Sequence, residues 1–163
     1  MKLAICPGSF DPVTCGHLDI ITRAAATFDK VIVVVMVNNN KQPLFSQEER
    51  VELLRRATAS LPNVEVDSYG GMLAEYAREK QASVIVKGLR AMSDFEYEFQ
   101  MALTNRKLNP LVETVFLTTN AEYMYLSSSL VKQVASLGGD IQEFVPACIV
   151  KDILEKYGRN EET

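Results

Sequence analysis

A run of seven consecutive apolar residues, Val31–Val37, constrains the fold of this chain more than any other feature. Most of its residues are β-branched, which favours an extended strand. The run has no alternation of polar and apolar residues, so both faces of the strand should be buried. Such burial is typical of a parallel sheet covered by helices on both sides. Because a membrane-spanning helix needs about 20 apolar residues, no membrane span is predicted.

Shorter apolar runs predict the other strands of the sheet. They are Leu3–Cys6, Val64–Val66, Val84–Val86 and Thr114–Thr119. Between them lie stretches in which apolar residues recur every three or four positions, a spacing that predicts helices. These are His17–Phe28, Gln47–Leu61, Met72–Lys80, a segment from Ser93 that includes Phe95, Phe99, Ala102 and Leu103, then Ser127–Leu137 and Ala147–Tyr157.

Local signals mark the ends of some of these helices. Ser46 with Glu49, and Ser93 with Glu96, have the spacing of a capping box and predict two helix starts. The pair that begins at Gly138 predicts a helix end, because glycine accepts the left-handed backbone found there.

The alternation of strands and helices predicts an α/β fold with right-handed crossovers. We expect a single doubly wound, Rossmann-like domain over residues 1–163, with a five-stranded parallel sheet. Residues 158–163 are expected to form a frayed polar tail.

Composition excludes several classes of protein. The formal net charge of −4 argues against binding of nucleic acid through bulk positive charge. Three scattered cysteines and the single histidine, His17, predict neither a disulfide framework nor a zinc site. No metal-ligating side chains are predicted, and a cytoplasmic location is expected.

Ligands of doubly wound sheets bind at the carboxyl ends of the strands. The loop after the first predicted strand carries Gly8, Gly16 and His17 and runs into a helix, whose N-terminus is an anion site. The chain lacks both the G-x-G-x-x-G and the G-x-x-x-x-G-K-[ST] phosphate-binding patterns. A histidine at this junction can donate a hydrogen bond to a phosphate oxygen as charge develops.

Two motifs carry a resemblance to a known superfamily. The run from Ser9-Phe10-Asp11-Pro12 to Gly16-His17 and the run Ser127-Ser128-Ser129, about 110 residues later, resemble the paired motifs of nucleotidylyltransferases. The segment Gly88-Leu89-Arg90-Ala91, followed by Asp94-Phe95-Glu96-Tyr97-Glu98, resembles the bacterial phosphopantetheine adenylyltransferase family. This second resemblance extends over nearly the whole chain.

The resemblance implies a reaction that joins ATP to 4′-phosphopantetheine and releases pyrophosphate. It implies catalytic roles for His17, Lys41 and Arg90. Binding of 4′-phosphopantetheine, the acceptor of the adenylyl group, would involve Ser9, Lys41, Leu73 and Lys87. Nucleotide binding would fall to Ser9, Phe10, His17, Gly88, Leu89, Arg90, Glu98, Tyr123, Met124, Tyr125, Leu126, Ser127, Ser128 and Ser129.

Several of these residues have plainer interpretations when the resemblance is set aside. Glu98 reads as a solvent-facing helix carboxylate, Leu73 as core and Lys41 as a solvated loop lysine. The serines that begin at Ser127 read as a helix cap, a role that is compatible with phosphate binding because the same free N–H groups serve both.

The resemblance also implies a Mg²⁺ ion that travels with ATP, inhibition by coenzyme A and a homohexamer. No nucleic acid or membrane partner is expected. Two alternatives stay open: another small-molecule adenylyl- or cytidylyltransferase, and a non-catalytic nucleotide-sensing module on the same fold.

Overall fold

The computed structural model describes residues 1–160, apart from the side chains of residues 92 and 93. Five parallel strands form one sheet in the order β3-β2-β1-β4-β5. Their bounds are β1 Leu3–Gly8, β2 Lys30–Met36, β3 Val64–Tyr69, β4 Val84–Leu89 and β5 Glu113–Thr118. The direction of winding reverses between β1 and β4, so the loops after these two strands diverge and leave a crevice at the carboxyl edge.

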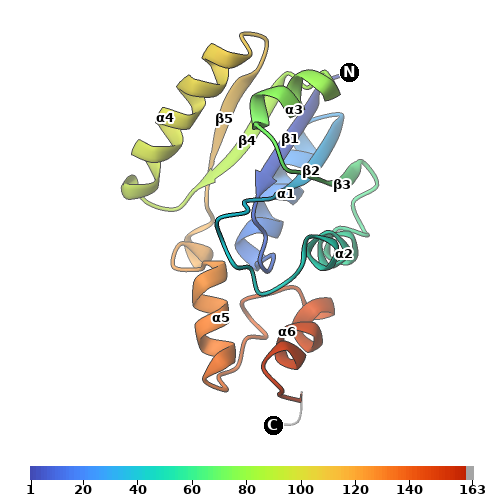
Figure 1. Cartoon of the computed structure of the whole chain (residues 1–163), viewed down its shortest axis with the longest axis vertical. Helices are drawn as coiled ribbons and strands as arrows, with labels where there is room; N and C mark the ends of the chain where they lie inside the picture. The colour runs from blue at the N-terminus through green and yellow to red at the C-terminus, as the bar shows by residue number, and fades with distance from the viewer. Residues whose placement is uncertain (161–163) are drawn as a thin grey trace.

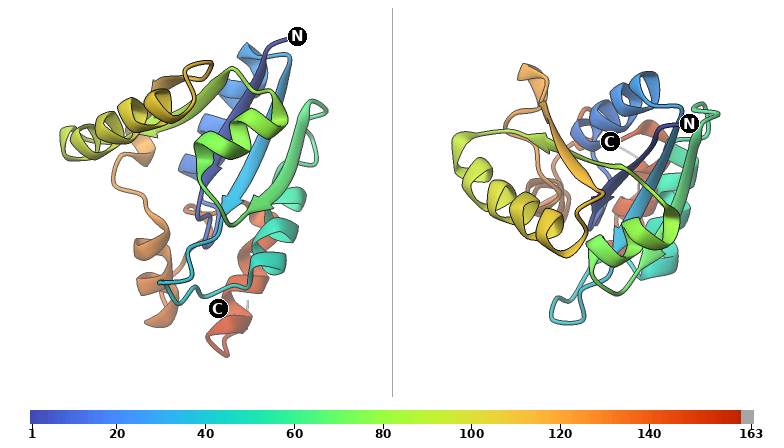
Figure 2. Two further views of the ribbon diagram at one scale, coloured as in Figure 1. Left: turned by 45° about the horizontal axis from the view of Figure 1, so that its top comes forward. Right: turned by 90° about the horizontal axis from the view of Figure 1, so that it is seen from above.

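The described helices are α1 Cys15–Thr27, α2 Gln47–Ala57, α3 Leu73–Lys80, α4 Met92–Leu108, α5 Ser128–Ser136 and α6 Val150–Lys156, with short 3₁₀ turns at Ala121–Tyr123 and Ala147–Ile149. Helices α1 and α2 cover one face of the sheet, and α3 and α4 lie on the other (Figures 1 and 2). Helices α5 and α6 lie beyond the carboxyl ends of the strands (Figure 1).

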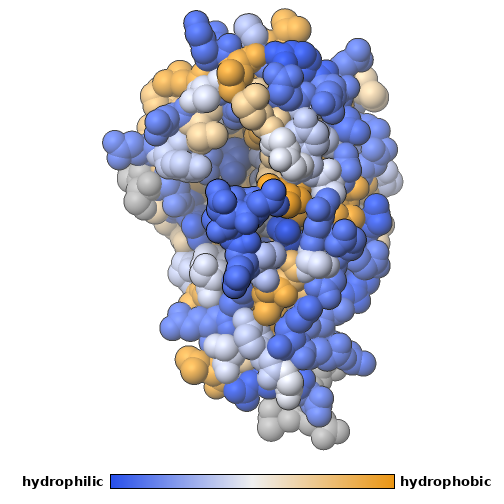
Figure 3. Space-filling model, in the orientation of Figure 1, coloured by the Kyte–Doolittle hydropathy of each residue, from blue (hydrophilic) through white to orange (hydrophobic). Residues whose placement is uncertain are grey.

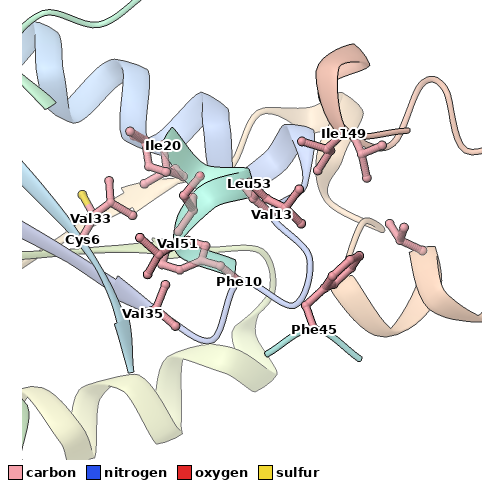
Figure 4. Packing of buried hydrophobic residues seen from close by; sticks show 14 of the residues in the cluster. Cys6, Phe10, Val13, Ile20, Val33, Val35, Phe45, Val51, Leu53 and Ile149 are labelled. Carbon is pink, nitrogen blue, oxygen red and sulfur yellow. The ribbon is translucent and has the colours of Figure 1, made fainter. Parts of the chain in front are cut away.

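Alternate side chains of β2 enter two separate cores. Val31, Val33 and Val35 belong to the larger cluster, on the α1 and α2 face, while Ile32 and Val34 pack under α3. This two-sided burial explains the unbroken apolar run in the sequence. The larger cluster continues past the sheet edge to the helices below it, as Figure 4 shows for Phe45 and Ile149.

The predicted fold class is confirmed, and all five predicted strands and six predicted helices occur in the described residues within a few positions of the predicted ends. The capping box of Ser46 and Glu49 is confirmed at the start of α2. The helix start predicted at Ser93 was wrong, because α4 begins at Met92 with Ala91 as its N-cap. The side chain of Ser93, on which the predicted capping box depends, lies outside the described residues.

The structure also shows how the chain continues after α5 and after α6. Gly138 has a φ of 81°, as predicted for the residue that terminates α5. Within the expected tail, Arg159 donates hydrogen bonds to the carbonyls of Leu154 and Ser136, while residues 161–163 lie outside the described residues.

None of the helices in the described part of the chain has the length and apolar character that a membrane crossing requires.

Candidate active site

Two adjoining hollows lie at the carboxyl edge of the sheet. The first hollow, of about 330 Å³, is lined by the loop after β1, the start of α1, the end of β4 and the start of α5. The second hollow, of about 500 Å³, opens between β2, α3 and α4. Both are lined by Pro7, Gly8, Ser9, Lys87 and Glu98, so they form one continuous cleft. Figure 3 shows the face between α3 and α4 hollowed, with hydrophilic residues deep in it and both hydrophobic and hydrophilic residues around it.

His17 lies at the floor of the first hollow as the third residue of α1. The backbone N–H of Thr14 donates to Nδ1 of His17 at 3.0 Å, and the Thr14 hydroxyl accepts from the His17 N–H at 3.2 Å. This is a capping box in which histidine takes the place usually held by glutamate or glutamine. Because a backbone N–H can only donate, Nδ1 must be unprotonated, and the neutral ring carries its proton on Nε2.

The surroundings of His17 favour this neutral ring. Burial, followed by the positive charges of Lys87 and Arg90, lowers the pKa of His17 from its ordinary value of 6.5 to about 4. Phe10, whose ring meets the imidazole edge-on at a centroid distance of 5.1 Å, contributes to the burial. Phe10 adopts a φ of 48°, an uncommon conformation for a residue other than glycine and one that tends to occur at functional loops.

This lowered pKa predicts a pH-dependent stability. Between about pH 6.5 and pH 4 the unfolded chain binds a proton at His17 that the folded chain does not, so folding stability falls as the pH falls through this range. When the pH is lowered from about 7 to 5, protonation of His17 in the unfolded chain should lower the free energy of unfolding by about 1–2 kcal/mol. Urea unfolding at both pH values should show a smaller loss in His17→Gln than in the wild type. Equal losses in the two proteins would contradict the prediction.

Two cationic side chains, those of Lys87 and Arg90, line the first hollow together with His17. The Lys87 Nζ lies 3.5 Å from a Glu98 carboxylate oxygen, and both side chains are partly buried. Arg90 donates from Nη1 to the Leu126 carbonyl at 2.8 Å, while its Nε lies 3.5 Å from Asp94. These contacts hold the cations at the cleft and leave further N–H donors for an anionic ligand, since a guanidinium has five.

The start of α5 closes the first hollow. The Ser127 hydroxyl accepts from the Leu130 N–H and so caps the helix, while the Ser128 hydroxyl donates to the Pro12 carbonyl at 2.7 Å. This second bond joins α5 to the loop after β1 across 116 positions of the sequence. Tyr123 and Leu126 also line the hollow.

The second hollow combines apolar walls with a lysine at its rim. Met36, Met72, Leu73, Met101 and Leu108 supply apolar surface. The exposed Lys41 also lines it, and Lys87 stands where it meets the first hollow. The hollow therefore suits a molecule with a long, weakly polar arm and an anionic end.

Most of the predicted site residues come together in this cleft. Ser9, Phe10, His17, Lys41, Leu73, Lys87, Gly88, Arg90, Glu98, Tyr123, Leu126, Ser127 and Ser128 line one or both hollows. Leu89, Met124, Tyr125 and Ser129 do not; the last three are exposed. Gly88 lets β4 approach α1, because a Cβ there would lie 2.9 Å from Cγ1 of Ile20.

Sequence reasoning assigned no role to four residues that organise the cleft. These are Asp11, Thr14, Arg50 and Lys132. Thr14 could have been found from its spacing to His17, which is that of a capping box. Arg50 donates to the Ser9 carbonyl at 3.0 Å from α2, a contact that no local pattern indicates.

A third hollow, of about 680 Å³, lies between α2 and α6, away from the predicted residues. Both of its basic side chains are paired with carboxylates: Arg56 lies 2.7 Å from Asp152, and Lys156 lies 2.9 Å from Glu49. We assign it no ligand.

The carboxylates that line the first hollow contact basic side chains. No three of their histidine, cysteine or acidic side chains gather into a metal-binding group within the described chain. Asp94 and Glu98, the carboxylates described as lining the first hollow, contact Arg90 and Lys87. Mg²⁺ is commonly held by substrate phosphates and water, which requires little from the protein.

Comparison with known proteins identifies the family of this chain. A family model described as cytidylyltransferase-like matches residues 5–134. A protein of Caldanaerobacter subterraneus subsp. tengcongensis named phosphopantetheine adenylyltransferase is 59% identical over 160 residues, which are 98% of this chain and 100% of that protein. One of the same name from Alkaliphilus metalliredigens is 59% identical over 156 residues, covering 96% of this chain and 99% of the relative. The chain belongs to the phosphopantetheine adenylyltransferase family.

This membership confirms the predicted family and makes the chain a nucleotidyltransferase. Solved structures show how widely the fold of the family is shared. Nicotinic acid mononucleotide adenylyltransferase of Plasmodium falciparum, complexed with NaAD, matches with a TM-score of 0.68 at 14% identity, covering 99% of each chain. A putative nicotinate-nucleotide adenylyltransferase of Vibrio parahaemolyticus matches with a TM-score of 0.70 at 19% identity, covering 96% of each chain. At such identities the likeness establishes the fold alone.

Proposed function

We propose that this chain transfers the adenylyl group of ATP to 4′-phosphopantetheine, forming dephospho-coenzyme A and pyrophosphate as a step of coenzyme A synthesis. One observation carries the proposal: two hollows of different character meet at Lys87. The first hollow, with a helix N-terminus and two basic side chains, suits a nucleoside triphosphate. The second, apolar and with Lys41 at its rim, suits a phosphate on a long arm. The names of the curated relatives support this pairing of substrates.

The reaction asks little covalent chemistry of the protein. A phosphate oxygen of the acceptor, already ionised at neutral pH, attacks the α-phosphorus of ATP in line with the leaving group. A new P–O bond forms, the bond from the α-phosphorus to the bridging oxygen breaks, and pyrophosphate leaves. Catalysis then depends on positioning the two anions and on stabilising the charge that develops between them.

His17 supplies directed stabilisation in this mechanism. Its Nδ1 is occupied by the Thr14 N–H, so its Nε2–H is the donor that remains for an α-phosphate oxygen. Ser9 adds a hydroxyl, Lys87 and Arg90 add positive charge, and Lys41 holds the acceptor phosphate. A neutral imidazole donor keeps the same protonation state throughout the reaction near pH 7.

The proposal extends to the metal ion, the assembly and the setting. ATP brings Mg²⁺, which neutralises phosphate charge while bound to phosphate oxygens and water. The functional assembly is a homohexamer, coenzyme A is a feedback inhibitor of the same cleft, and the enzyme works in the cytoplasm. These parts rest on the resemblance to the family.

Pyrophosphate release tests the proposal directly. The enzyme, ATP and Mg²⁺ are incubated with and without 4′-phosphopantetheine, and the product is identified by mass. We expect release that depends on phosphopantetheine, together with dephospho-coenzyme A. Release with nicotinate mononucleotide instead would keep the fold class and overturn the substrate. ATP binding without turnover on any acceptor would favour a nucleotide-sensing module.

A further inference from the structure

Asp11 is a buried carboxylate to which the proposed mechanism gives no task. Its side chain is only 8% exposed. One oxygen, Oδ1, accepts from the Phe45 N–H at 2.9 Å. The other, Oδ2, accepts from the Leu44 N–H at 2.9 Å and lies 3.1 Å from Nζ of Lys132. A buried carboxylate is costly unless it is paired and hydrogen-bonded, and here both oxygens are used.

These contacts bring three distant segments to one carboxyl group. Asp11 belongs to the segment from the end of β1 to His17 in the first turn of α1, which we call the catalytic loop (residues 9–17). Leu44 and Phe45 end the loop after β2 that carries Lys41, which we call the Lys41 loop (residues 38–45). Lys132 lies on α5, which closes the nucleotide side of the cleft. The carboxylate therefore sits between the elements that we assign to the two substrates.

The two neighbouring segments depend on Asp11 to different degrees. Helix α5 has a second bond to the catalytic loop, because the Ser128 hydroxyl donates to the Pro12 carbonyl. The Lys41 loop is held at its end by the two N–H groups that Asp11 accepts, with the Phe45 side chain 2% exposed in the core (Figure 4). Loss of the Asp11 charge should therefore disturb the Lys41 loop before it disturbs α5.

We propose that Asp11 is a positioning residue that fixes the Lys41 loop against the catalytic loop, with Lys132 as its counter-ion. The inference rests on the proposed function, since Lys41 is assigned to the acceptor phosphate. Lys132 then acts through Asp11. The rival assignment, a direct contact of Lys132 with a ligand phosphate, has less support, because Lys132 is not among the described residues that line either hollow.

Two substitutions separate these assignments. Asp11→Asn keeps the shape of the side chain but replaces one carboxylate oxygen by an NH₂ group. That group cannot accept the hydrogen bonds that Asp11 accepts from the backbone N–H groups and from Lys132. Lys132→Met removes the counter-ion at similar length. We expect Asp11→Asn to raise the KM for 4′-phosphopantetheine and to lower kcat/KM for it by roughly 10- to 100-fold, the effect of an unsatisfied buried group. The Kd for ATP, measured by calorimetry without acceptor, should change little.

The double variant provides the decisive comparison. If Lys132 acts through Asp11, Asp11→Asn combined with Lys132→Met should be no worse than Asp11→Asn alone. Losses in kcat/KM that multiply would overturn the proposal and favour an independent phosphate contact. If Asp11→Asn does not fold, Lys132→Met alone still decides, because weakened ATP binding with an unchanged acceptor KM would also overturn it.

A matched control and the wild type complete the experiment. Lys30 is the first residue of β2, so it lies at the edge of the sheet opposite the cleft. Lys30→Met removes this partly exposed lysine, whose Nζ lies 2.7 Å from a Glu65 carboxylate oxygen. Its kinetics should match those of the wild type. A wild type without phosphopantetheine-dependent turnover would refute the proposed function, whereas normal acceptor kinetics in Asp11→Asn beside an active wild type would refute the positioning role alone.

Discussion

Replacing His17 by glutamine is expected to lower kcat by about 10²–10³-fold while leaving the free energy of unfolding near pH 7 close to that of the wild type. Glutamine at this position can accept the Thr14 N–H, as glutamine does in other capping boxes, so the start of α1 keeps its cap. Its amide NH₂ can also donate, but it lacks the rigid ring that aims the imidazole Nε2–H at the first hollow, so we expect a poorer contact with the phosphate. Steady-state kinetics and urea unfolding of the same preparation measure the two effects separately.

His17→Ala is the matched control for this pair of roles. Alanine removes both the donor and the cap, so it should lose turnover like glutamine and also lose about 1 kcal/mol of stability. Near-normal turnover in a folded His17→Gln protein would remove the imidazole from the mechanism. Equal stability of the alanine and glutamine variants would show that the capping contact contributes nothing.

Replacing Lys87 by methionine is the second change with a large expected effect. Lys87 is the basic side chain that lines both hollows, and its charged contacts to phosphate should be worth roughly 10- to 100-fold in kcat/KM. Methionine keeps the length of the side chain but leaves the Glu98 carboxylate, 3.5 Å away in the intact pair, facing two polyanions. Both the acceptor KM and the ATP KM should rise.

The double variant Lys87→Met with Glu98→Gln tests the cause of that loss. Removing the unpaired carboxylate should recover part of the rate, because the repulsion disappears while the attraction to phosphate stays lost. Full recovery would mean that Lys87 serves only to neutralise Glu98. A wild-type rate in Lys87→Met itself would take Lys87 out of the site.

The fold was predictable from the sequence because strands and helices leave local patterns. The run Val31–Val37 predicted a strand that is buried on both faces, and β2 is that strand. The helix start placed at Ser93 was wrong because the same spacing of serine and glutamate also occurs inside helices. Helix α4 begins without a side-chain cap, and Asp94 in its first turn accepts from the Arg90 N–H instead.

The site was only partly predictable, because its organising contacts join residues that are distant in sequence. Lys132 and Asp11 are 121 positions apart, and nothing local to either one indicates a pair. Leu89 stands between Gly88 and Arg90, which line the first hollow, yet it lines neither hollow itself, and nothing in the sequence distinguishes it from its neighbours. Ser129 is exposed, whereas Ser127 and Ser128 turn toward the cleft.

The junction of the two hollows at Lys87 has a consequence for the design of inhibitors. Two weak fragments, one in each hollow, could be joined by a linker that crosses Gly8 and Ser9, which line both. Binding of the first fragment would then present the second at a high effective concentration, and the affinity of the linked molecule can exceed that of either fragment by about 10²–10⁴-fold. A linker too short to span the junction would lose this advantage, so its length is the variable to optimise first.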